Sequence, residues 1–503
     1  MAEHPASAEK VTSMARLQLI KHATVALLLA VLSACTVGPD YVKPKVETPP
    51  SYKEVEGWKK AEPQDSISRG SWWTIYNDEQ LNALEAQVNI SNQNLAAAEA
   101  QYRQALALVQ VARAAYFPTV TAGPSVSRSR TSANARGSQG VSDTSSDYLL
   151  SGQVTWQPDL WGKVRRQVES SKASAQASDA DLEGVRLSMQ GQLAQDYFVL
   201  RTLDSQNQIL TTTVGNYRKF LALTKNRYAT GVAAQSDVLT AQTQVETAEA
   251  QLIDTGVQRA QLEHAIAVLM GKAPSDLTIP ATPLDLTPPD IPSGIPSELL
   301  ERRPDIAAAE RQAAAANALI GVAEAAYYPN VTLSATGGFE ASSLAQWFLW
   351  PSRFWTLGPA AVQETLLDGG LRRAQTEQAR AAYDASAATY RQTVLAGFQQ
   401  VEDNLAALRI LEQEGKAADA AADSAKKNVV ITINQYKVGT ASALDVIVTE
   451  AIALNDELTA VNVLGRRLTS DVLLVQALGG GWSTADLASD KFVGQKHYKG
   501  FPW

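Results

Sequence analysis

The sequence predicts an α+β membrane protein in which each chain supplies four strands to a trimeric 12-stranded β-barrel, continued by a long α-helical barrel. Three observations predict this fold. The chain holds two copies of one unit, each copy has two segments that alternate with period two, and each copy has a helical run of roughly 65 residues. At about 1.5 Å per residue, such a run forms a rod near 100 Å long, which exceeds ordinary globular helices.

Composition excludes several classes of protein. The 503 residues include 44 Lys and Arg against 52 Asp and Glu, and the resulting charge of −8 has the wrong sign for a nucleic-acid partner. Beyond the first 34 residues the only histidines are His264 and His497, and Cys35 is the single cysteine. We therefore expect no metal site, no disulfide and no Cys/His catalytic pair. The chain also lacks a Gly-x-Ser-x-Gly elbow and a phosphate-binding glycine loop, so we predict no enzyme.

Residues 1–34 have the pattern of an export signal that is removed. Arg16 and Lys21 precede an apolar run from Ala23 to Leu32 that is too short to span a bilayer. The ending Leu-Ser-Ala-Cys resembles a bacterial lipobox, in which Cys35 is lipidated and becomes the new N-terminus. The alternative is an ordinary buried cysteine after a plain signal. By the same resemblance, Thr36 in place of Asp favours the outer membrane. A covalent lipid is the only non-protein group expected.

The remaining chain is a duplication. Residues 114–121 recur as 325–332 at an offset of 211, and 228–238 recur as 436–446 at an offset of 208. The first repeat spans 78–271 and the second 297–479. We divide the rest into a lipidated N-terminal extension at 35–77, a Pro-rich linker at 272–296 and a loosely held C-terminal tail at 480–503.

Each repeat follows the same order of elements. A stretch of helix formers, 78–115 or 297–326, ends before Pro118 or Pro329, because proline breaks a helix. Period-two alternation then predicts two strands in each repeat. The long helical run follows Gly162 or Gly370, and a second helix returns after a glycine. The predicted strands span 118–129, 147–158, 330–340 and 354–366.

The alternation gives each strand one apolar and one polar face. We assign the apolar face to lipid and the Ser/Thr/Gln face to a water-filled interior. Aromatic residues at the strand ends predict two interfacial belts. A soluble β-sandwich with buried aromatic residues is the alternative, and the two helical runs of roughly 65 residues argue against it. One belt contains Tyr116, Phe117, Tyr327 and Tyr328, and the other contains Trp347, Trp350 and Trp355 with their aromatic neighbours.

Four strands cannot close a barrel by themselves. Single-chain outer-membrane barrels begin at about eight strands, and an open edge in hydrocarbon leaves unpaired backbone groups that cost several kcal/mol each. Two copies would give eight strands and too narrow an interior for so long a tube, whereas three copies give twelve. We therefore expect a homotrimer in contact with membrane lipid, with the rods continuing the tube into the periplasm.

Several motifs resemble the outer membrane factor family, the TolC-like exit ducts. They are Gly38-Pro39-Asp40-Tyr41, Trp72-Trp73, Arg302-Arg303-Pro304-Asp305 and the terminal Ala477-Leu478-Gly479-Gly480-Gly481-Trp482. Within the family the chain is most similar to the lipoprotein branch that serves resistance-nodulation-division (RND) efflux pumps. The resemblance implies a passive trimeric exit duct in the outer membrane for drugs or other small toxic compounds. It also implies two partners, a periplasmic adaptor protein and an inner membrane RND pump.

The same resemblance implies a gate at the periplasmic tip. The residue matching Asp237 is bonded in the family by the tyrosine matching Tyr436, and the position matching Asp445 forms a ring of carboxylates. Ala441 and Val448 replace an arginine and a second aspartate of the family, so we expect Leu444 to form a hydrophobic constriction. The simpler alternative is that the aspartates only cap helices that begin after each turn.

The turns themselves carry a second implied role. In the family the tips that match Gly231, Val232, Gly439 and Thr440 receive the hairpins of the adaptor. Alternatively, the two glycines only supply the positive φ that a turn needs.

Three other functions compete with efflux. The chain could be the outer membrane exit channel of a type I protein secretion system, although the lipobox and the Gly-Pro-Asp-Tyr start argue against that alternative. A periplasmic hydrolase is disfavoured because the sequence lacks the catalytic residues that such an enzyme needs. A purely structural coiled-coil lipoprotein is disfavoured because it would not require period-two strands.

Overall fold

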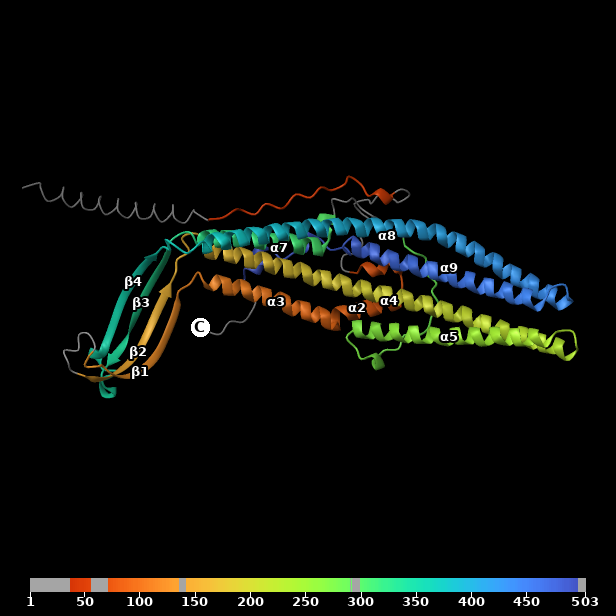
Figure 1. Cartoon of the computed structure of the whole chain (residues 1–503), viewed down its shortest axis with the longest axis horizontal. Coiled ribbons are helices and arrows are strands. Elements are labelled where there is room, and N and C mark those ends of the chain that lie inside the picture. The colour runs from red at the N-terminus through yellow and green to blue at the C-terminus, as the bar shows by residue number, and fades with distance from the viewer. Residues whose placement is uncertain (1–36, 56–70, 135–141, 290, 292–298, 496–503) are drawn as a thin grey trace, which may run out of the picture.

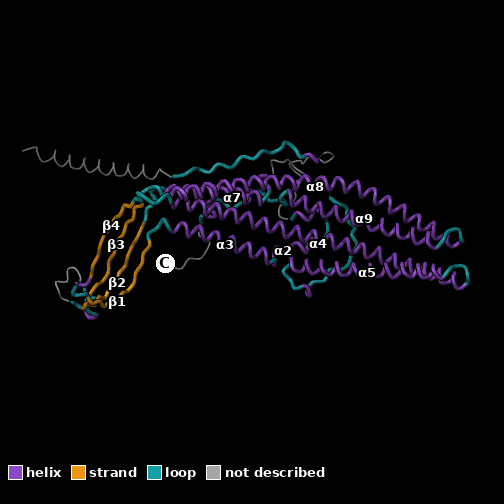
Figure 2. Tube along the Cα trace, viewed as in Figure 1, coloured by secondary structure: helices purple, strands orange, loops and turns teal. Residues whose placement is uncertain are grey.

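The computed structural model describes residues 37–55, 71–134, 142–289, 291 and 299–495. The molecule is elongated, with one sheet at one end and a bundle of long helices that ends in two hairpin tips at the other (Figure 1). All four strands lie together and all long helices run away from them in one direction (Figure 2).

The sheet has four antiparallel strands in the order β1-β2-β3-β4. Each predicted strand is confirmed to within about three residues, and β1 and β4 are the outermost strands of the described sheet. β1 and β2 come from the first repeat, and β3 and β4 from the second. The strands are β1 (Thr119–Arg130), β2 (Thr144–Trp156), β3 (Asn330–Ala341) and β4 (Arg353–Gln363).

The register places apolar and polar side chains on opposite faces. Val120 lies opposite Val154, which lies opposite Ala335, and Ala335 lies opposite Leu357. The neighbouring row, Thr121, Gln153, Thr336 and Thr356, is polar throughout. Since successive side chains of a strand alternate between faces, the predicted apolar and polar faces are confirmed. On the apolar face Leu357 is 79% exposed within the chain.

The long rods are α4 (Lys163–Ala229, 67 residues) and α8 (Leu371–Val438, 68 residues), as predicted. Both begin after a glycine with positive φ, and in both the preceding aspartate accepts backbone N–H groups of the first turn. Asp159 accepts from Val164 and Arg165 at 2.9 and 2.8 Å, and Asp368 accepts from Arg372 at 3.3 Å and from the N-cap Gly370 at 2.9 Å. The returning helices are α5 (Gln235–Leu269) and α9 (Ala443–Ala477). Among the described helices, none combines the length and apolar character needed to cross a membrane.

The shorter helices pack beside the rods at the sheet-proximal half. They are α2 (Glu79–Ser91), α3 (Gln93–Ala114), α6 (Leu299–Arg302) and α7 (Pro304–Ala325). The stretch predicted as one helix at 78–115 is therefore two. Asn92 divides it, because its side chain accepts from Leu95 N at 3.0 Å as the N-cap of α3 and donates to Leu269 O at 2.7 Å.

The expectation of a loosely held C-terminal tail is wrong for residues 483–495. Gln176 of α4 donates to Ala488 O and to the Asp490 carboxylate at 3.0 and 2.9 Å. Val493, in the short helix α10 (Asp490–Val493), is fully buried against Leu106 and Val109. Burial of this apolar surface fixes the segment between α3 and α4. Sequence periodicity could not reveal it.

The N-terminal extension is fastened to both repeats. Arg166 of α4 donates to Val37 O, Gly38 O and the Asp40 carboxylate. Gly38 has φ of +94°, and a Cβ atom there would lie 2.3 Å from Gly321 Cα of α7. Glycine is therefore required at residue 38 both for its backbone conformation and for this close approach.

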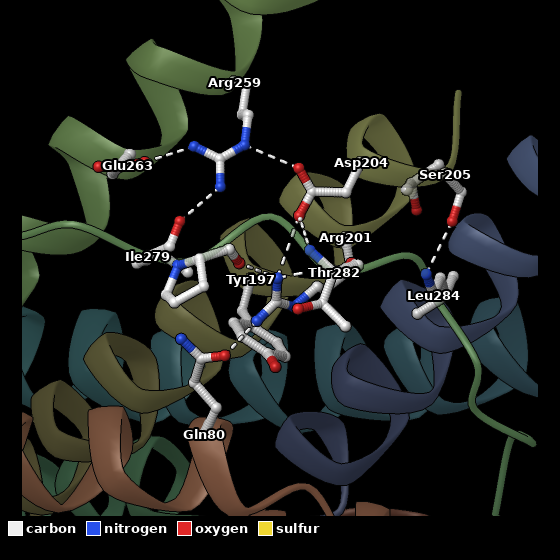
Figure 3. Close-up of polar contacts among 12 residues, drawn as sticks. Gln80, Tyr197, Arg201, Asp204, Ser205, Arg259, Glu263, Ile279, Thr282 and Leu284 are labelled. Carbon is white, nitrogen blue, oxygen red and sulfur yellow. Dashed lines mark hydrogen bonds and ion pairs between the residues drawn. The ribbon is translucent and has the colours of Figure 1, made fainter. Parts of the chain in front are cut away.

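The linker between the repeats is held by a buried network of charges (Figure 3). The Asp204 carboxylate accepts from Arg201 and Arg259 at 3.0 and 2.7 Å and from the backbone N–H of Thr282 at 3.0 Å. Arg201 also donates to Pro280 O at 2.7 Å, and Arg259 to Ile279 O at 2.6 Å. The Arg201 and Asp204 side chains are 4% and 2% exposed, so the ion pair that holds the linker against the helices is buried.

Replacement of Asp204 by alanine should destabilise the helical region by about 3–5 kcal/mol, because two arginines and a linker N–H lose their shared buried acceptor. Hydrogen exchange of the linker amides of Thr282 and Leu284 measures this loss. Glu249→Ala is the matched control, since Glu249 pairs with Arg218 at the surface, where about 1 kcal/mol or less is expected. Equal protection of these amides in both variants would contradict the assigned role.

Candidate functional site

The predicted site residues lie at opposite ends of the molecule. The aromatic residues lie at the two ends of the sheet, and the gate and tip residues lie where α4 meets α5 and where α8 meets α9. Cys35, the predicted lipidation site, lies outside the described residues.

The first aromatic group surrounds the junction between sheet and helices. Trp161 stacks on Tyr328 with ring centroids 5.0 Å apart and donates to Pro329 O at 2.8 Å. The guanidinium of Arg372 lies 5.4 Å from the ring centroid of Tyr327. Tyr116 accepts through its backbone O from Trp156 at 3.0 Å, and Phe117 is 70% exposed. Sequence reasoning did not assign Trp161 to this belt.

The second aromatic group lies at the far end of the sheet. Trp347 stacks on Phe348 with centroids 4.8 Å apart and also contacts Tyr148 of β2. Trp350 and Trp355 are 74% and 75% exposed within the chain. At about 3.4 Å per residue, a 12-residue strand spans roughly 40 Å, and a tilt near 45° reduces this to about 28 Å, close to the hydrocarbon thickness of a bilayer.

The two hairpin tips have the same backbone structure. Gly231 and Gly439 have φ of +76° and +85°. Val232 N donates to Arg227 O at 2.8 Å, and Thr440 N donates to Gln435 O at 3.0 Å. These are Schellman bonds, which satisfy the last carbonyls of each rod. Val232 and Thr440 lie exposed just beyond the two glycines.

The contact between Asp237 and Tyr436 that the family resemblance implied is not formed between these two described residues. Asp237 instead accepts from the backbone N–H of Ala234 at 3.2 Å, which makes it a cap of its own helix. The Tyr436 hydroxyl lies 3.4 Å from Thr224 Oγ1 of α4. Asp237 and Tyr436 each have another partner. In this structure Asp237 therefore acts as a helix-capping residue, which was the simpler alternative.

Tyr436 is the centre of a buried cluster that joins the two hairpins near their tips. Its side chain is 3% exposed, its ring lies 5.2 Å from the Phe220 ring, and the Arg227 guanidinium lies over it at 4.5 Å. Sequence reasoning missed Phe220 and Arg227, because nothing in a single sequence pairs α4 with the end of α8. The cluster also contains Ala241 of α5 and Ala443, Val446 and Ile447 of α9.

Asp445 and Leu444 lie on the exposed side of α9. Asp445 forms a capping box with Ser442, in which Ser442 N and Oγ each donate to the carboxylate at 2.7 Å. The hydrogen bonds from the Ser442 side chain and backbone lower the pKa of Asp445 below its usual value, so this carboxylate stays charged. Leu444 is 63% exposed and lies on α9 one turn before Val448, which is also exposed.

Comparison with known proteins decides the family. The model described as "Outer membrane efflux protein" matches residues 84–272 and 295–480, which covers both repeats. The chain belongs to the outer membrane efflux protein family. It therefore resides in the outer membrane and serves as the exit duct of an efflux system, and the family consists of channels rather than enzymes.

Individual relatives match over nearly their whole length. The toluene efflux pump outer membrane protein TtgC of Pseudomonas putida is 27% identical over 91% of this chain and 95% of its own. The pyoverdine export outer membrane protein OpmQ of Pseudomonas putida is 30% identical over 85% of this chain and 92% of its own. The outer-membrane channel OprN superposes with a TM-score of 0.83 and 30% identity, covering 89% of this chain and all of the solved one.

The fold class predicted from the sequence is thereby confirmed. Each chain of this efflux protein supplies one four-stranded sheet to a trimeric 12-stranded barrel, and its long helices continue the duct. The apolar face of the sheet and its two aromatic ends agree with a barrel wall in contact with lipid.

Tyr436→Ala should destabilise the tip of the second hairpin by about 3 kcal/mol, because it removes a buried ring from the cluster. Hydrogen exchange at the C-terminal turns of α8 should rise accordingly. The repeat provides its own control in Tyr228→Ala, since Tyr228 occupies the equivalent position but is 47% exposed. If both variants exchange alike, Tyr436 does not join the hairpins.

Proposed function

We propose that the chain forms a passive trimeric duct that carries drugs or other small toxic compounds from a periplasmic adaptor and an inner membrane RND pump to the outside. The observation that carries this proposal is the joining of a four-stranded barrel segment to two rods that end in exposed hairpin tips. The names of relatives support it, since TtgC is a toluene efflux pump protein and SrpC a solvent efflux pump protein. The duct needs no energy source of its own.

Gating is proposed to reside at Asp237, Tyr436, Leu444 and Asp445. The structure favours packing over a hydrogen-bonded clasp: Tyr436 holds α8 against α4, while Asp237 and Asp445 fix the first turns of α5 and α9. Around a threefold axis, exposed Leu444 side chains would form an apolar constriction and Asp445 carboxylates a ring that attracts cations.

Lipid attachment at Cys35 is proposed to fix the height of the duct in the membrane. Val37 N donates to Trp161 O at 3.2 Å, and Trp161 stacks on Tyr328 of the first aromatic belt. A lipid on Cys35, two residues before Val37 in the sequence, would therefore anchor the chain close to the belt, where headgroups meet hydrocarbon.

No relative named above supports the alternative, exit from a type I protein secretion system. TtgC and SrpC are efflux pump proteins by name, and neighbouring genes for an RND pump and its adaptor would agree with the efflux assignment.

Cys35→Ser should abolish the lipid while leaving the trimer intact, because the sheet supplies its own apolar face. Intact-mass spectrometry of detergent-extracted protein should show acyl groups on wild-type Cys35 and none on the variant. Light scattering with detergent subtracted gives the oligomeric state of both. Wild-type protein that retains an unmodified Cys35 or an uncut leader would refute the lipoprotein assignment.

Gly439→Trp should abolish pump-dependent resistance in cells without lowering trimer yield, because a bulky side chain at the tip obstructs adaptor docking. Nothing lies within 4 Å of a Cβ atom placed at Gly439, so the first side-chain atom has open space, although the positive φ adds strain of about 1–2 kcal/mol. Gly439→Ala carries the same strain without the bulk and serves as control. Equal loss of resistance in both variants would assign the glycine to turn formation only.

A further inference from the structure

Glu450 of α9 is a buried acid near the periplasmic tip, and it is not one of the proposed gate residues. It continues the buried face of the helix formed by Val446, Ile447 and Ala453, and it is 5% exposed. An apolar residue would normally occupy such a position in a helix interface. The carboxylate therefore needs a physical explanation.

Neither carboxylate oxygen of Glu450 has a hydrogen-bond partner among the described residues. The titratable group that faces it from α4 is Tyr217, whose own side chain is buried with Val245 and Ala248 of α5. From α8, the stretch 428–435 at this level contains no charged residue. The nearby ions pair with one another at the surface, Arg218 with Glu249 and Lys426 with Glu457.

A groove of about 230 Å³ lies beside this position between α4, α5 and α9. Its lining includes polar side chains from both hairpins, Tyr217 of α4, Gln244 and Gln251 of α5 and Asn455 of α9. Ala451, the residue that follows Glu450, lines this groove, so a slight separation of the helices would open a route for proton exchange with the carboxylate. The same movement would hydrate an ionised carboxylate.

We propose that Glu450 is a proton-controlled element of the periplasmic gate: protonated, it keeps α9 packed against α4, and ionised, it favours separation of the two hairpins. The inference rests on the proposed gate at this end of the duct. It adds a residue whose charge state, rather than its packing alone, sets the equilibrium between packed and separated tips. The separated state exposes the carboxylate to water, which removes the cost of a buried charge.

The direction of the pH dependence follows from linkage. Burial raises the pKa of Glu450 to about 7 in the packed state, whereas an exposed glutamate has a pKa near 4.3. The packed arrangement is therefore fully stabilised below about pH 4.3 and loses that stabilisation as the pH rises through about 7. From about pH 6 to about pH 8 the equilibrium constant for separation rises about tenfold per chain. Asp445, with its lowered pKa, stays ionised over this range and cannot produce the effect.

The test is the conductance of the full-length trimer in planar bilayers between about pH 6 and about pH 8. Wild-type opening should rise about tenfold or more across this range. Glu450→Gln preserves the shape of the side chain but cannot ionise, so its opening should stay low and independent of pH. Glu457→Gln, on the same helix but in a surface pair with Lys426, should respond like the wild type.

A distance measurement separates failure of this inference from failure of the duct. Spin labels on Val232→Cys and Thr440→Cys report the separation of the tips whether or not the protein conducts. The distance should widen with pH in the otherwise wild-type background and remain constant with Glu450→Gln. Pores that conduct while tip distance and opening ignore pH would overturn the role of Glu450 and leave the duct standing. Absence of any pore would overturn the proposed duct.

Discussion

The structure depends on the need of every backbone N–H and C=O in hydrocarbon to have a hydrogen-bond partner. The described part of each chain forms four strands, and β1 and β4 are the outermost of this sheet. Those edges are satisfied when neighbouring copies supply the next strand, which is why one chain is a third of a barrel. Once the strands are placed around a threefold axis, the rods that leave the same end of each sheet become the wall of a tube.

The duplication supplies two similar hairpins, but their environments differ. The Schellman turns at Gly231 and Gly439 have the same bonds, and both returning helices have an aspartate in the first turn. Tyr436, however, is buried against Phe220, whereas its repeat equivalent Tyr228 is half-exposed. The second hairpin therefore supplies the tyrosine at the centre of the cluster. Glu450 lies on α9, one turn beyond Val446 of the same cluster. The two turns therefore have the same backbone bonds but unequal side-chain packing.

Polar anchors lie further from the tips than this apolar cluster. Arg201, Asp204 and Arg259 hold the linker with buried ion pairs, and Arg166 holds the N-terminal extension through Val37, Gly38 and Asp40. Removing one member of such a group leaves a buried charge without compensation, so the groups act together. The tips, in contrast, are joined by a small apolar cluster around Tyr436.

The sequence alone determined the duplication, the four strands with their apolar and polar faces, the rods and the family, because these depend on local periodicity and on motifs contiguous in the chain. Only the tertiary structure showed that Val493 fixes the C-terminal segment and that Tyr436 reaches Thr224 rather than Asp237. It also showed that Glu450 is buried with no hydrogen-bond partner for its carboxylate within the described part of the chain. Each of these depends on which helix lies beside which, over separations of hundreds of residues. Burial and the charge it suppresses are properties of that packing, and a single sequence carries no signal for them.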